Sequence, residues 1–137
     1  MKNTFIFQAA KEENGFRPCF GVAEFPDLLP SSLENHNKIL TRRQKITIVF
    51  DYPMNTSAKF TYTSKNGFTY RSFFKCVYGG YKKIYKEEGP NPGMIPGMWN
   101  RRPTHGKYGI WGHVITDLVL TSATEVKPGI FTLGIDS

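Results

Sequence analysis

The sequence predicts an α+β domain, with a mainly antiparallel sheet of about five strands and one long amphipathic helix packed on one face. Two observations lead to this fold class. Apolar and polar residues alternate over 44–63, which is typical of half-buried strands, and apolar residues recur at helical spacing over 70–88. A chain of 137 residues can bury one core of its own, so we expect a single domain over 1–137.

The chain is expected to begin with a short strand over residues 4–8, where Phe5 and Phe7 share one face. Three prolines interrupt residues 9–43 and break any long helix or strand. We therefore expect an irregular, partly buried connection between this first strand and the next regular element.

A hairpin is expected over residues 44–63. Ile46, Ile48 and Phe50 alternate with more polar neighbours in its first strand, and residues 57–63 repeat the alternation. Residues 53–56 have turn chemistry, and the Asn-Gly pair at 66–67 readily adopts positive φ. The pattern therefore predicts two antiparallel strands that end just before residue 67.

One long helix is expected over residues 70–88. Thr69 is suited to cap its first turn, and the Gly-Pro pair at 89–90 is suited to end it. The predicted core face is rich in aromatic rings and consists of Tyr70, Phe73, Phe74, Val77, Tyr78, Tyr81, Ile84 and Tyr85. After the helix, we expect a long loop over 89–113 and two further strands over 114–120 and 130–134, with a Pro-Gly turn at 128–129 before the last strand.

The positive charge is concentrated in the middle of the chain. The net charge is +7, and residues 31–113 contain fourteen basic and only four acidic side chains. Such a distribution favours a positively charged surface that attracts an acidic protein, nucleic acid or another polyanion. The alternative is a soluble protein that simply has a high isoelectric point.

A row of basic residues follows the predicted helix opposite its core face. Arg71, Lys75, Lys82 and Lys86 fall within about 60° of one another on a helical projection. Gly79 lies in the same row, and a glycine there would let a bound polyanion approach the backbone closely. The alternative is an ordinary solvated lysine face, with Gly79 and Gly80 set for packing or a kink.

The loop over 89–113 combines aromatic rings with positive charge and contains no acid. Such rings can stack on the bases of a single-stranded nucleic acid or dock into a protein partner. A self-packed loop whose tryptophans complete the core is the alternative. The candidate binding residues of the loop are Trp99, Arg101, Arg102, Lys107, Tyr108 and Trp111.

Catalytic patterns are weak in this sequence. His105, His113 and Asp117 provide the ligand types of a non-haem iron site, although their spacing is not diagnostic. Cys19 and Cys76 are too few for a disulfide framework or a four-cysteine zinc site. These patterns do not decide whether the protein is an enzyme, and we consider a non-catalytic role the better interpretation. We expect no cofactor.

The function predicted from these patterns is a binding or assembly domain that serves as a subunit or accessory protein of a larger complex, with an acidic protein as partner. Single-stranded nucleic-acid binding and metal-dependent catalysis are the alternatives. No apolar run approaches the ~20 residues that cross a bilayer, and the apolar helix face is needed for the core. We therefore expect no membrane binding and a soluble, intracellular protein, with cytoplasm and nucleus not distinguished.

Overall fold

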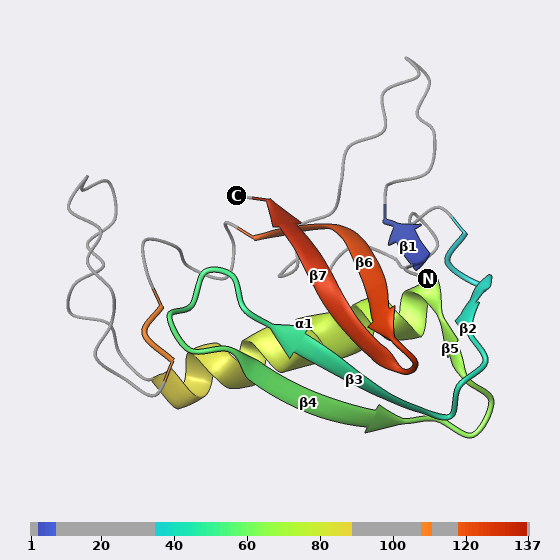
Figure 1. Cartoon of the computed structure of the whole chain (residues 1–137), viewed down its shortest axis with the longest axis horizontal. Coiled ribbons are helices and arrows are strands. Elements are labelled where there is room, and N and C mark those ends of the chain that lie inside the picture. The colour runs from blue at the N-terminus through green and yellow to red at the C-terminus, as the bar shows by residue number, and fades with distance from the viewer. Residues whose placement is uncertain (1–2, 8–34, 89–107, 111–117, 137) are drawn as a thin grey trace, which may run out of the picture.

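The structure, a computed structural model, describes residues 3–7, 35–88, 108–110 and 118–136 (Figure 1). These residues form one helix and seven strands. In chain order the elements are β1 (Asn3–Ile6), β2 (Ile39–Thr41), β3 (Lys45–Phe50), β4 (Ala58–Thr63), β5 (Phe68–Thr69), α1 (Tyr70–Glu88), β6 (Val119–Lys127) and β7 (Ile130–Asp136).

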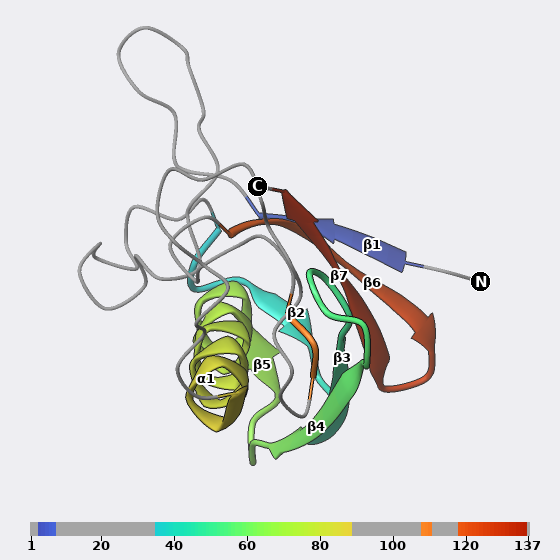
Figure 2. The same ribbon diagram turned by 90° about the vertical axis from the view of Figure 1, so that its left-hand side faces the viewer.

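Five of the strands form one mixed sheet in the order β1-β6-β7-β3-β4. Every neighbouring pair in it is antiparallel except β3 and β7, which run parallel. The short strands β2 and β5 pair separately. α1 lies across one face of the five-stranded sheet (Figure 2). The α+β class and a mostly antiparallel five-stranded sheet are therefore confirmed, with one parallel pair that the sequence did not predict.

The core lies between α1 and the sheet. Alternation in β3 directs Ile46, Ile48 and Phe50 inward, where all three are buried. The Phe50 ring meets the Tyr81 ring edge-on at 5.0 Å, and the Tyr81 hydroxyl donates to the Tyr52 carbonyl at 2.7 Å. Aromatic contacts of this kind fix the position of the helix as well as burying area.

The element boundaries agree with the sequence in some places and differ in others. α1 begins and ends at the predicted residues, and the hairpin and the positive φ of Gly67 are as expected. β6 continues to Lys127, well beyond the predicted end at 120, while residues 114–117 lie outside the described part. β2 and β5 were not predicted, because strands of two or three residues have no readable period.

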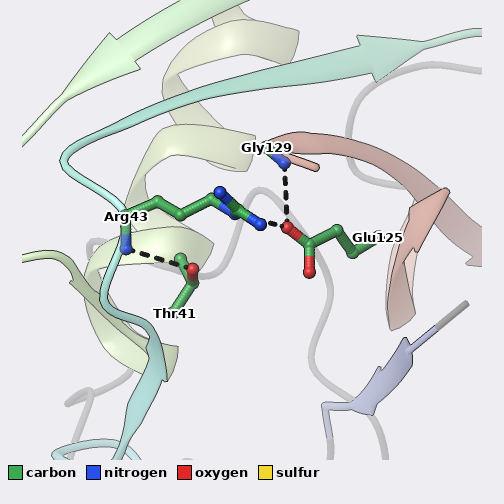
Figure 3. A network of polar contacts seen from close by, with 4 residues as sticks. All are labelled: Thr41, Arg43, Glu125 and Gly129. Atoms are coloured by element: carbon green, nitrogen blue, oxygen red, sulfur yellow. Dashed lines mark hydrogen bonds and ion pairs between the residues drawn. The ribbon is translucent and has the colours of Figure 1, made fainter. Parts of the chain in front are cut away.

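A polar network joins the β6–β7 turn to the segment that precedes β3 (Figure 3). One oxygen of Glu125, Oε2, accepts from Arg43 Nε at 2.8 Å and from the Gly129 amide at 2.9 Å. Gly129 has a φ of 75°, which favours glycine at this turn. The Gly129 carbonyl in turn accepts from the Thr47 amide at 2.8 Å. The network therefore braces the end of the sheet where β3 and β7 run parallel.

Candidate binding surface on α1

A reciprocal side-chain cap begins α1 at Tyr70. Thr69 Oγ1 accepts from the Ser72 amide at 3.1 Å, and Ser72 Oγ accepts from the Thr69 amide at 2.8 Å. Each bond satisfies a backbone donor that the helix itself leaves unpaired. The cap fixes where the helix starts and hence which residues point to the sheet and which to solvent.

Four cations follow the side of α1 that faces away from the sheet. Arg71, Lys75, Lys82 and Lys86 are all exposed, and their spacing of four, seven and four residues places them on one side. We call these four residues the basic row. None of them forms an ion pair within the described residues. Their charge is therefore not neutralised by the neighbouring parts of the structure.

Lys83 extends the positive surface from α1 to the sheet. Its Nζ lies 4.8 Å from the centre of the Phe60 ring in β4, while Lys82 Nζ lies 5.7 Å from the Tyr78 ring. Both are cation–π contacts. Lys83 was not among the predicted binding residues, because only the packing of α1 on β4 shows where its side chain points.

The two adjacent glycines of α1 have different surroundings. Gly79 is exposed, and a Cβ added there would have nothing within 4 Å. Gly80 is buried, and a Cβ there would overlap the Phe50 ring. Close packing of α1 on β3 therefore explains Gly80, as the packing alternative expected for that position. Gly79 leaves the backbone open in the middle of the basic row.

Tyr108 must be removed from the predicted binding residues. It is 3% exposed, and its hydroxyl donates to Glu87 Oε1 at 2.8 Å while its amide donates to Glu88 Oε1 at 2.8 Å. The ring therefore packs in the core and does not offer a face to a base or a partner. The contacts also give both glutamates at the C-terminal end of α1 a structural role.

The other predicted loop and metal residues lie outside the described part of the chain. For the loop these are Trp99, Arg101, Arg102, Lys107 and Trp111, and for the metal site they are His105, His113 and Asp117. The structure therefore does not test the predictions made for these residues. Among the residues that it does describe, no three His, Cys, Asp or Glu side chains could hold a metal ion.

Cys76 lies beside the basic row and is half-buried. Burial raises the pKa of its thiol from 9.0 to about 11, with the Lys75 ammonium acting in the opposite direction. The Tyr62 hydroxyl donates to the Cys76 carbonyl at 3.2 Å, and burial raises the pKa of Tyr62 as well. A thiol kept neutral in this way is a poor nucleophile, so Cys76 has a packing role at this site.

The chain matches no family model, no curated protein and no solved structure. Within the described residues, no helix has both the length and the apolar character needed to cross a membrane. The charges and contacts of the described residues are therefore what indicates a function for this chain.

Proposed function

We propose that this protein is a non-catalytic binding domain that uses the basic row of α1 to bind an acidic surface of a protein partner, as a subunit or accessory protein of a larger assembly. The observation that carries the proposal is the exposure of four cations on one side of one helix without ion pairs among the described residues. A run of like charge of this kind attracts an oppositely charged partner and orients it on approach.

The dimensions of the row suit a partner surface. Arg71 and Lys86 are fifteen residues apart, which corresponds to about 22 Å along a helix. Lys83 widens the positive area toward β4. Burial of Tyr108 removes one ring from a base-stacking surface and equally from a protein-docking surface, so the basic row alone supports the choice of partner. We propose the protein, and the titrations below separate it from a nucleic acid.

The proposal is tested with two variants of equal charge. The first, R71Q/K75Q/K82Q/K86Q, removes the basic row. The second, K38Q/K45Q/K65Q/K127Q, removes four other exposed cations. Fluorescence anisotropy measures binding to labelled poly-L-glutamate at two salt concentrations. We expect at least tenfold weaker binding for the first variant and less than threefold weaker binding for the second.

Equal losses in the two variants would show that only net charge matters and would contradict the proposal. The same titration with a single-stranded RNA covers the nucleic-acid alternative. Tighter binding to RNA than to poly-L-glutamate, with a steep dependence on salt, would replace the protein partner with a nucleic acid.

A further inference from the structure

β4 forms an open edge of the five-stranded sheet. It is the last strand in the order β1-β6-β7-β3-β4, and no other described strand pairs with its outer side. Figure 1 shows β4 along the lower border of the molecule. It has six residues, whereas the strand at the opposite edge, β1, has four. Proteins commonly shorten or cover such an edge, because its unpaired backbone can bind another strand.

The hydrogen-bond register identifies which backbone groups of β4 are free. The Ser64 amide donates to the Gln44 carbonyl at 2.8 Å, and hydrogen-bonded pairs recur every second residue in an antiparallel ladder. Ala58, Phe60 and Tyr62 therefore pair with β3. The amides and carbonyls of Lys59, Thr61 and Thr63 point outward, and all three residues are exposed.

The two sides of this edge differ in chemistry. Toward α1, β4 presents the half-buried rings of Phe60 and Tyr62, with Lys83 lying over the former. On the other face, Lys59 is exposed and forms no ion pair within the described residues. In an added strand, every second side chain would therefore lie on the α1 side and contact the rings of Phe60 and Tyr62. The side chains between them would lie on the other face, next to Lys59.

We propose that an extended segment of the acidic partner adds to the edge of β4 as a sixth strand. Its glutamate or aspartate side chains lie opposite Lys59, and its alternate apolar side chains pack on Phe60 and Tyr62. This inference rests on the proposed function, because it specifies how the acidic partner binds. A second copy of this chain suits the edge less well, since each copy has a net charge of +7 and would bring its own Lys59 and Lys83 to the interface.

The test uses a fluorescent peptide, acetyl-(Val-Glu)₄-amide, and two methylated forms of it. In an antiparallel sixth strand, the residues opposite Lys59, Thr61 and Thr63 point their amides at β4, and in the proposed register these are the glutamates. N-methylation of the glutamate amides should weaken binding to the unmodified protein at least tenfold. N-methylation of the valine amides should change binding less than threefold, because those amides point away from β4.

A pair of protein variants tests the same bonds from the other side. Thr61→Pro removes an outward-facing donor, whereas Thr61→Val keeps the amide, and both lose the 3.1 Å side-chain hydrogen bond to Thr47. We expect at least tenfold weaker peptide binding for T61P than for T61V. Circular dichroism shows whether each variant is folded, and the methylated peptides test the proposal on the unmodified protein in either case.

Three outcomes would overturn strand addition: no peptide binding at millimolar concentration, equal binding of the two methylated peptides, or equal binding by folded T61P and T61V. Binding to poly-L-glutamate separates this failure from failure of the proposed function. If the R71Q/K75Q/K82Q/K86Q variant still loses that binding, the basic row retains its role and only the edge of β4 is excluded.

Discussion

Gly79 and Gly80 are neighbours in α1, but glycine is present at the two positions for different physical reasons. Every glycine in the middle of a helix costs stability relative to alanine, by about 1 kcal/mol. At position 80 this cost is offset by contact between the helix and the Phe50 ring. At position 79 no contact offsets it, because the space beyond the Cα is open.

Alanine substitutions should therefore have opposite effects at these two positions. Gly80→Ala should destabilise the protein by about 1–3 kcal/mol, because the new methyl group displaces Phe50 from the core. Gly79→Ala should stabilise it by up to about 1 kcal/mol through higher helix propensity. Urea denaturation measures both. Destabilisation by G79A and tolerance of G80A would contradict the packing of α1 on β3.

Cys76 provides a test at the scale of one ionisable group. Its pKa of about 11, two units above the ordinary value of 9.0, leaves roughly 100-fold less thiolate at pH 8 than a free cysteine has. Iodoacetamide should therefore modify Cys76 at least about tenfold more slowly than a model thiol, because the higher nucleophilicity of a thiolate of raised pKa offsets part of its lower population; the rate is measured in a Cys19→Ser variant. A rate equal to that of the model thiol would show that the thiol is not buried as described.

The same raised pKa predicts how stability changes with pH. The folded state favours the neutral thiol, so the contribution of Cys76 is complete below the unfolded pKa of 9.0 and is lost as pH rises toward about 11. The free energy of unfolding is measured at pH 8 and at pH 10.5 for the wild type and for Cys76→Ser. It should fall less between these two pH values in the variant than in the wild type. An unchanged difference would contradict the burial of the thiol.

Individual elements were predictable where local patterns decide them. The helix over 70–88 follows from its apolar spacing and its Thr69 cap, and the hairpin follows from strict alternation. The order of strands was not predictable, because pairing between β1 and β6 joins residues more than a hundred positions apart. The parallel contact of β3 and β7 likewise depends on the path of the whole chain.

The candidate site was predictable to the extent that one helix determines it. Helical spacing alone placed the basic row on one side of α1. The burial of Tyr108 could not be read from the sequence, because it depends on contacts of that residue with Glu87 and Glu88, about twenty positions away. The position of Lys83 over Phe60 is also a contact between separate elements.

Glu125 provides a test at the scale of elements, because it connects the β6–β7 turn to the segment before β3. Glu125→Ala should destabilise the protein by about 1–2 kcal/mol, since it removes a charge-assisted bond and leaves the Gly129 amide without its acceptor. Arg43→Ala should cost less, under about 1 kcal/mol, because Arg43 is 47% exposed and the bond to Gly129 remains.

Urea denaturation of the two variants gives this comparison directly. Glu125→Gln keeps an acceptor oxygen and should fall between the wild type and Glu125→Ala. If R43A proved as destabilising as E125A, the hydrogen bond from the Gly129 amide to Glu125 would add nothing to the free energy of unfolding. The role assigned to this network would then be wrong.

At the scale of the whole molecule, the exposed positive charge of the described residues includes two separate groups that a partner would have to distinguish. One is the basic row of α1 together with Lys83. The other is an open depression of about 330 Å³ at the end of the β3–β4 hairpin, lined by Gln44, Lys45, Thr63, Ser64 and Lys65. The function proposed here requires an acidic partner to distinguish the first surface from the second, which total charge alone would not achieve.

An NMR titration of the ¹⁵N-labelled protein with poly-L-glutamate tests this requirement most directly. Binding to the basic row predicts amide shift changes that concentrate in the exposed positions of α1, around residues 71–86, and only small changes at Lys45 and Lys65. Shift changes centred on Lys45 and Lys65, or spread evenly over all exposed lysines, would contradict the assignment of the binding surface to α1.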